Sequence, residues 1–165
     1  MNAAFALCLA VCAASTIAPV ARAQSDSASL SILNGAAVEY LFPEQITVPA
    51  GKSVPVALHF RVAQTLHINS HAPHDEFLIP TEFSIPAASG VKLDAVTYPQ
   101  GEEITLPSDP KTKLSVYTGE FTLNTRIVAA AGNHLVEAKL HYQACNTTQC
   151  LPPKTISVAI DVIGK

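Results

Sequence analysis

Two cysteines near the C-terminal end, Cys145 and Cys150, are the residues of this sequence best suited to chemistry. Four polar residues separate them, and one alternating segment ends just before the pair while another begins just after it. Facing residues on antiparallel strands have Cβ atoms about 4.5–5.5 Å apart, which is close to disulfide geometry. We therefore expect the two cysteines to face each other across a tight connection and to form a disulfide.

A disulfide at this spacing can be a structural staple or a redox switch. By the loop-entropy relation, a disulfide that closes so short a loop stabilises the folded protein by about 2 kcal/mol, against about 3 kcal/mol for a loop of fifteen residues. The bridge therefore contributes little to stability. A tight, exposed or strained bridge is also readily reduced by thiol–disulfide exchange. The spacing alone leaves these two interpretations nearly even.

The second group that could do chemistry consists of three histidines: His67, His71 and His74. They lie beside Asp75 and Glu76, and imidazoles together with carboxylates can hold zinc or copper. Pro73 breaks the segment, and the spacing matches no helix. We favour a solvated loop rich in histidine, with a periplasmic metal carrier as an alternative.

Residues beside these groups are candidates for supporting roles. His141 lies four residues before Cys145, an even offset that puts both residues on one face of a strand. An imidazolium there would favour the thiolate, although an exposed strand histidine is the simpler interpretation. Tyr142 follows the apolar alternation, which predicts a packing residue rather than a catalyst. Glu102 and Glu103 are expected in a solvated turn and not as an acid–base pair.

Strands must position these residues, because the sequence alternates with period two. Apolar residues alternate with others in the segments 54–62, 91–98, 121–124, 136–142 and 156–162. Strict alternation predicts strands with one buried face, and proline and glycine punctuate the runs. Seven to nine short strands without a long helical segment predict an all-β protein, an antiparallel two-sheet β-sandwich.

The N-terminal residues predict export. Residues 3–21 are mostly apolar, and Ala21-Arg22-Ala23 places small residues at −3 and −1 of a cleavage before Gln24. The alternatives are a membrane anchor and a lipoprotein signal ending at Cys12.

The predicted organisation is a signal peptide at 1–23, a flexible segment at 24–39 and one domain at 40–165. Cleavage removes Cys8 and Cys12, so that the exported chain keeps only the Cys145/Cys150 pair. Export also takes this pair to a compartment where disulfides form.

Composition excludes several classes of protein. A chain with 48% hydrophobic and 14% charged residues is a globular domain rather than a disordered tail. Its net charge of −3 and its scattered basic residues argue against nucleic-acid binding. The only methionine is the initiator, which excludes a methionine metal site in the exported chain.

The residues around the cysteines resemble a known family. Tyr142-Gln143-Ala144-Cys145 followed by Cys150-Leu151-Pro152-Pro153 is similar to the Tyr-Gln-Gly/Ala-Cys…Cys-x-Pro-Pro signature of the N-terminal domain of the thiol:disulfide interchange protein DsbD. Four further segments agree in order: 66–69, 78–82, 98–101 and 116–119. The resemblance covers residues 40–162 and is strongest over 142–153.

This resemblance implies an immunoglobulin-like sandwich with a redox dithiol near one end. Such a periplasmic protein-disulfide reductase, with no cofactor, takes electrons from a thioredoxin-like or DsbD-type membrane donor and passes them to oxidised periplasmic proteins. Carried over by position, Cys150 links to partner cysteines and Cys145 resolves the mixed disulfide. Tyr142, Gln143 and Pro152 of the matched signature are supporting candidates, together with His141, which directly precedes it.

Two features depart from the family's pattern. Four residues instead of five separate the cysteines, and the segment 102–113 has no aromatic side chain to shield the disulfide as the family's cap loop does. We also expect the electrons to come from another protein, because the chain carries no thioredoxin-like or transmembrane domain. The non-enzymatic alternative is a β-sandwich interaction module with a structural disulfide.

Overall fold

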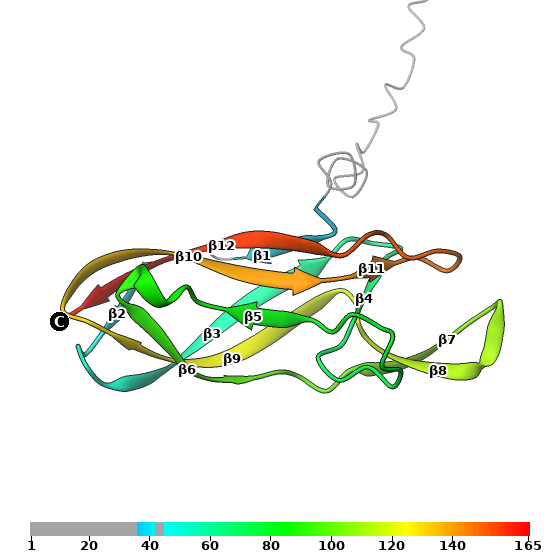
Figure 1. The fold of residues 1–165 in the computed structure, drawn as a ribbon, viewed down its shortest axis with the longest axis horizontal. Helices are drawn as coiled ribbons and strands as arrows, with labels where there is room; N and C mark the ends of the chain where they lie inside the picture. The colour runs from blue at the N-terminus through cyan, green and yellow to red at the C-terminus, as the bar shows by residue number, and fades with distance from the viewer. Residues whose placement is uncertain (1–35, 42–44) are drawn as a thin grey trace, which may run out of the picture.

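The computed structural model describes residues 36–41 and 45–165, and nearly all of its regular structure is strand (Figure 1). The predicted signal peptide at 1–23 lies outside the described residues. Within them, no helix is long and apolar enough to cross a membrane, and the only helical element is the 3₁₀ turn η1 at Ala87–Ser89. The prediction of an all-β protein is confirmed.

Two four-stranded sheets enclose the core. The first has the order β1-β3-β9-β6 and the second β2-β12-β10-β5. Their bounds are β1 Val38–Leu41, β2 Gln45–Val48, β3 Ser53–Val62, β5 Glu82–Ser84, β6 Val91–Thr97, β9 Glu120–Ala129, β10 Gly132–Tyr142 and β12 Lys154–Gly164. Alternate residues of both sheets form one apolar cluster, for example Leu58 and Leu123 from the first sheet and Leu140 and Val158 from the second.

Alternating burial follows the predicted pattern in the long strands. In β3, Val56, Leu58, Phe60 and Val62 are buried while the residues between them are exposed, and β10 and β12 show the same period. In β6 the pairing with β9 shifts between Leu93 and Ala95. This bulge inserts one residue, so Val96 packs on the core and Ala95 is exposed, opposite to the predicted phase.

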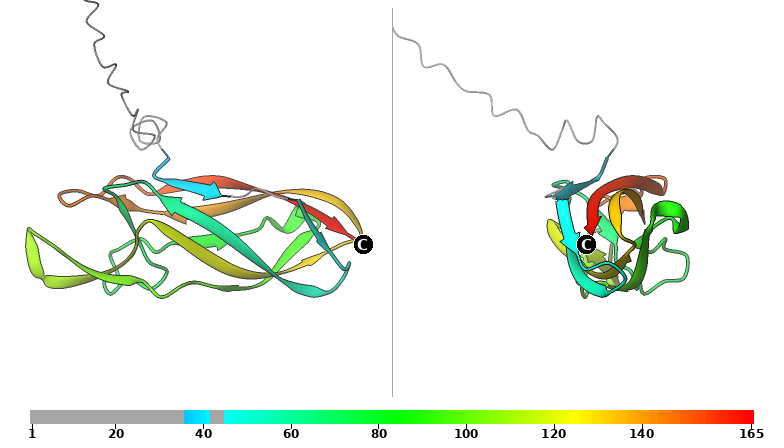
Figure 2. Two further views of the ribbon diagram at one scale, coloured as in Figure 1. Left: turned by 180° about the vertical axis from the view of Figure 1, so that it is seen from behind. Right: turned by 90° about the vertical axis from the view of Figure 1, so that its left-hand side faces the viewer.

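A third sheet extends one end of the sandwich. Its order is β11-β4-β8-β7, with bounds β4 His67–Asn69, β7 Glu102–Leu106, β8 Asp109–Tyr117 and β11 Ala144–Cys145. Glu102 and Glu103 therefore lie in a strand and not in the predicted turn, because the chain there forms a protruding hairpin. This hairpin and the turn that follows β11 project from the same end of the molecule, and the C-terminus lies at the other end (Figures 1 and 2).

The structure differs from the sequence-based expectation in two further details. The pairing of β12 with β2 is parallel, from Asp161↔Gln45 to Gly164↔Val48, so the sandwich is not purely antiparallel. The segment predicted to be flexible up to residue 39 includes the buried Ala37 and the first two residues of β1. That edge strand is too short to show an alternation in the sequence.

Candidate functional site

Cys145 and Cys150 form a disulfide between the end of β11 and the strand-like segment that returns from it. The Leu151 amide donates to the Ala144 carbonyl at 2.8 Å, and the Asn146 amide donates to the Gln149 carbonyl at 2.9 Å. The cysteines between these bonds are a non-hydrogen-bonded antiparallel pair, the position at which facing side chains approach most closely. The predicted facing arrangement is confirmed.

Asn146 orders the turn between the two cysteines. Its Oδ1 accepts hydrogen bonds from the Thr148 amide at 2.8 Å, the Gln149 amide at 2.9 Å and the Thr148 hydroxyl at 3.0 Å. An asparagine that bonds the backbone two residues ahead forms an Asx turn. The side chain of Asn146, the first residue of the turn, therefore stabilises the shape of the turn.

The two cysteine residues differ strongly in exposure. Cys145 is only 3% exposed, whereas Cys150 belongs to the exposed residues of the turn. A nucleophile from another protein can therefore approach the Cys150 side of the bond, while the Cys145 side is covered. The sequence carries no signal for this difference, because β11 pairs with β4, a strand far from it in the sequence.

Gln143 joins the segments on either side of the disulfide. Its Nε2 donates to the Leu151 carbonyl at 3.2 Å, and its own carbonyl accepts from the Asn69 amide at 3.3 Å. Asn69, buried in β4, also donates from Nδ2 to the Gln143 Oε1 at 3.4 Å. Gln143 thus fixes the chain where it leaves β10 and enters β11.

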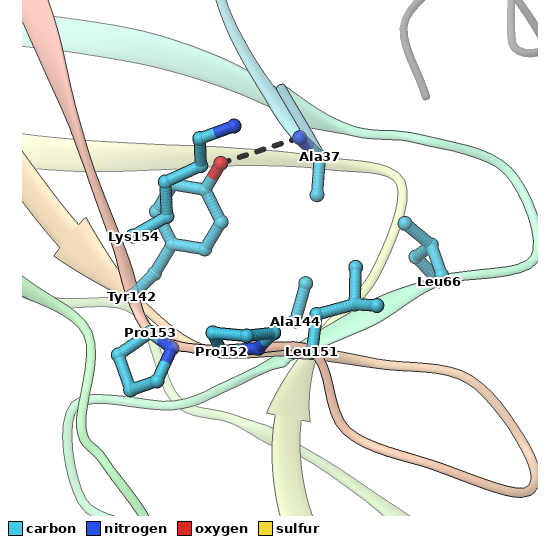
Figure 3. A pocket seen from close by; sticks show the side chains of 8 residues that line it. All are labelled: Ala37, Leu66, Tyr142, Ala144, Leu151, Pro152, Pro153 and Lys154. Atoms are coloured by element: carbon cyan, nitrogen blue, oxygen red, sulfur yellow. Dashed lines mark hydrogen bonds between the residues drawn. The ribbon is translucent and has the colours of Figure 1, made fainter. Parts of the chain in front are cut away.

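An apolar hollow of about 300 Å³ is lined in part by the residues next to the two cysteines, Ala144 and Leu151 (Figure 3). Its lining comes from both arms of the cysteine turn and from the neighbouring segments: Ala37, Leu66, Tyr142, Ala144, Leu151, Pro152, Pro153 and Lys154. Tyr142 is 1% exposed, and its hydroxyl accepts a hydrogen bond from the Ala37 amide at 3.2 Å. Tyr142 is thus a packing residue, as its position in the alternation predicts, and Pro152 contributes surface to the hollow.

A family model described as "Thiol:disulfide interchange protein DsbD, N-terminal" matches residues 37–161. The chain belongs to this family. Membership implies thiol–disulfide exchange, and the chain has the cysteine pair that such exchange requires. Comparison with curated proteins gave no match.

Two solved structures resemble the chain. The reduced DsbD N-terminal domain of Neisseria meningitidis is 20% identical with a TM-score of 0.46, and the match covers 70% of this chain and 82% of that chain. The N-terminal periplasmic domain of ScsB from Proteus mirabilis is 13% identical with a TM-score of 0.51, and the match covers 75% of this chain and 44% of that chain. The family match and the two facing sheets confirm the immunoglobulin-like sandwich predicted from the resemblance to DsbD.

His141 does not share a face with Cys145 in this DsbD-type domain. Its Nδ1 lies 2.9 Å from the Thr155 hydroxyl of β12, on the outer face of the second sheet. The chain crosses at Gln143 from that sheet into the third, and both Ala144 and Cys145 are buried. The even offset predicted a shared face only for an uninterrupted strand.

The three candidate metal-binding histidines are engaged in different ways. His71 stacks on Tyr98 with ring centroids 3.7 Å apart, and its Nδ1 lies 3.0 Å from the Thr81 carbonyl. The His74 Nε2 lies 2.7 Å from a carboxylate oxygen of Glu103 on the hairpin, and His67 is buried in β4. In the part of the chain that the structure describes, no three His, Cys, Asp or Glu residues are grouped to hold a metal ion.

The β7–β8 hairpin occupies the sequence position at which the DsbD cap loop was expected. It is fixed at its base, where the Ser70 and Ser115 hydroxyls lie 2.9 Å apart and Tyr117 donates to the Pro99 carbonyl at 3.0 Å. Cys150 is nevertheless exposed, so the hairpin leaves the disulfide unshielded in this structure.

Proposed function

We propose that this chain is an exported thiol–disulfide exchange module that acts as a protein-disulfide reductase through Cys145 and Cys150. Its electrons come from a thioredoxin-like or DsbD-type membrane donor and go to oxidised periplasmic proteins. The periplasmic location is supported by the apolar N-terminal segment and by the ScsB relative, which is a periplasmic domain.

The observation that carries the proposal is the exposure of one cysteine residue and the burial of the other. Thiol–disulfide exchange needs a thiolate to attack a disulfide sulfur directly, so the attacked sulfur must be reachable. Cys150 is reachable and Cys145 is 3% exposed. A purely structural bridge has no need of this asymmetry.

The proposed cycle moves two electrons and two protons. A donor thiolate attacks the Cys150 sulfur, the Cys145 sulfur leaves and is protonated, and the donor's second thiol then displaces Cys150 to leave a dithiol here and a disulfide on the donor. In the other half, the Cys150 thiolate opens a partner's disulfide and forms a mixed disulfide. Cys145 then attacks Cys150, and the partner leaves with both of its cysteines reduced.

The apolar hollow supports a protein partner rather than a small thiol. Ala144 and Leu151, which line it, are the immediate neighbours of Cys145 and Cys150. A polypeptide whose cysteine reaches the Cys150 sulfur must therefore lay its adjacent residues over this surface. Burial of about one leucine side chain there would contribute roughly 1.5–3 kcal/mol.

Trapping with single cysteine variants tests the proposal. Cys145→Ala keeps the exposed thiol and loses the resolving one, so it should accumulate mixed disulfides with periplasmic proteins and with a thioredoxin-like donor. Cys150→Ala is the matched control and should trap far less, because its remaining thiol is buried. Trapping by Cys150→Ala and not by Cys145→Ala would contradict the proposed role of Cys150.

The reduction potential of the pair separates exchange from a structural bridge. Equilibration of the exported domain in thiol buffers should give a value of about −180 to −250 mV, in the range of working oxidoreductases. A value below about −300 mV, with nothing trapped by Cys145→Ala, would favour the interaction module with a structural disulfide.

A further inference from the structure

A histidine stands next to the buried sulfur, on the side away from Cys150. In the β4–β11 pair, His67 lies directly opposite Cys145, and Cys145 in turn lies opposite Cys150. Directly opposed residues of antiparallel strands share a face, with Cβ atoms about 4.5–5.5 Å apart. His67, Cys145 and Cys150 therefore form one row, with the buried sulfur in the middle.

His67 has an unsatisfied nitrogen. The residue is 6% exposed, and its buried Nε2 has no hydrogen-bond partner among the described residues. The ring of each of the other five histidines has a hydrogen-bond partner. For His59, His74 and His141 it is a side-chain oxygen of Thr122, Glu103 and Thr155, and for His71 and His134 it is the backbone carbonyl of Thr81 and Ala130. Buried polar atoms are nearly always paired, so an orphan of this kind points to a partner supplied in another state of the molecule.

Opening the disulfide supplies such a partner. In the oxidised protein the Cys145 sulfur is bonded toward Cys150, away from His67 in the row. Once the bond is broken, rotation about χ1 can turn this sulfur toward the imidazole. A thiol buried beside an unpaired ring nitrogen can donate its proton to it.

We propose that His67 is the reduced-state partner of Cys145 and accepts its thiol proton when Cys145 resolves a mixed disulfide at Cys150. This inference rests on the proposed function and names the base of its resolving step. The proton passes from the Cys145 sulfur to the His67 Nε2, the new sulfur–sulfur bond forms to Cys150, and the partner's sulfur leaves as a thiolate. That thiolate or solvent then takes the proton from the imidazolium.

The surroundings of His67 keep the imidazole neutral and able to accept a proton. Burial lowers the pKa of His67 and is the only cause of its shift. On β11 the facing titratable group is Cys145, and on β8 Tyr117 pairs with Ile68 beside it. Glu102 of β7, which pairs with Val116 of β8, accepts a hydrogen bond from Thr118 at 2.7 Å and contributes nothing to the shift.

Equilibration in glutathione buffers tests the proposed hydrogen bond between the Cys145 thiol and His67 in the reduced protein. His67→Phe fills the same space without a ring nitrogen, so the dithiol should lose its hydrogen bond and the equilibrium should move about tenfold toward the disulfide. That change corresponds to a potential about 30 mV more negative. His67→Gln, whose amide oxygen can accept the thiol proton's hydrogen bond, should keep a potential near that of the wild type.

The resolving step tests the proton transfer. Reduced protein is mixed with oxidised glutathione, and release of the second glutathione is followed between pH 5.5 and 8.5. The wild type should resolve at a rate that varies little with pH down to the lowered pKa of His67. Both His67→Phe and His67→Gln should resolve at least tenfold more slowly at pH 7 and with a steeper pH dependence, because neither side chain takes up a proton.

The controls separate this inference from the proposed function. His134→Phe removes a histidine at the opposite end of the sandwich and should leave potential and rates unchanged. Circular dichroism and denaturant unfolding of the oxidised variants check that each is folded. Wild-type potential together with wild-type rates and pH profile in folded His67→Phe would overturn the role of His67. Failure of Cys145→Ala to trap any protein would count against the proposed function alone, because the glutathione measurements do not need a protein partner.

Discussion

One side chain, Asn146, determines the shape of the turn that closes the disulfide. Its Oδ1 accepts three hydrogen bonds from Thr148 and Gln149. Asn146→Ala should lower the free energy of unfolding of the oxidised protein by about 1 kcal/mol, the net value of a hydrogen bond. It should also shift the redox equilibrium several-fold toward the dithiol, since the turn would no longer hold the two cysteines face to face. Denaturant unfolding and equilibration in glutathione buffers measure the two effects.

Thr147→Ala is the matched control for Asn146. Thr147 lies in the same turn, is exposed and takes part in none of these three bonds. It should change neither the stability nor the redox equilibrium by more than a few tenths of a kcal/mol. Equal effects of the two substitutions would mean that the Asx turn does not position the cysteines.

At the scale of elements, the sequence predicts long strands well and short ones poorly. β3, β9, β10 and β12 bury one whole face each, so their apolar residues alternate and can be recognised. β4, β5 and β11 have two or three residues, too few to show a period. β8 exposes its first five residues because its hairpin protrudes, so no alternation marks it.

The same limit applies to the candidate site. The cysteine pair and its turn are local, so spacing predicts them. The pairing of His67 with Cys145 depends on the register of two very short strands far apart in the sequence, which no local pattern encodes. The sequence groups His67 with His71 and His74, whereas the structure pairs it with Cys145 of the disulfide.

The segment that leaves the disulfide, Leu151-Pro152-Pro153, forms one wall of the apolar hollow, and this leads to a prediction about partners. Leu151 is 38% exposed, and a charge there would have to be desolvated when a polypeptide covers the hollow. Leu151→Asp should lower the second-order rate of exchange with a protein partner about tenfold, equal to 1.4 kcal/mol. The rate with glutathione should change little, because glutathione does not need the hollow.

A leucine at the other end of the molecule provides the control. Leu135, near the start of β10 and paired with Asp161 of β12, is 73% exposed, and Leu135→Asp introduces the same charge far from the disulfide. It should leave both rates unchanged. If Leu151→Asp slowed glutathione and protein partners equally, the substitution would be acting on the disulfide itself and not on docking.

At the scale of the whole molecule, tyrosine hydroxyls connect separate parts of the fold. Tyr142 of β10 accepts a hydrogen bond from Ala37 before β1, and Tyr98 after β6 accepts one from the Phe83 amide of β5 at 2.8 Å. Tyr117 of the third sheet stacks on Phe121 of the first, with ring centroids 4.9 Å apart. Burial raises the pKa of Tyr98, Tyr117 and Tyr142, and of the half-buried Tyr40.

These raised pKa values predict alkaline destabilisation. The folded protein holds the phenolic protons more tightly than the unfolded chain, whose tyrosines titrate near 10. The stabilisation is therefore complete below about pH 10 and is lost as the pH rises through the folded-state values. Denaturant unfolding between pH 8 and 11.5 should show a stability that falls only above about pH 10, with tyrosinate absorbance rising as the protein unfolds.

Tyr142→Phe separates the titration from the packing. It keeps the ring in the core and removes the hydroxyl, so it should cost about 1 kcal/mol at pH 7, because the Ala37 amide loses its acceptor. Above pH 10 its stability should fall less steeply than that of the parent, because one raised pKa is gone. Both proteins should carry Cys145→Ala and Cys150→Ala, so that disulfide exchange at high pH does not contribute. Tyrosines that ionise near pH 10 while the circular dichroism stays native would contradict the view that burial of these hydroxyls ties the sheets together.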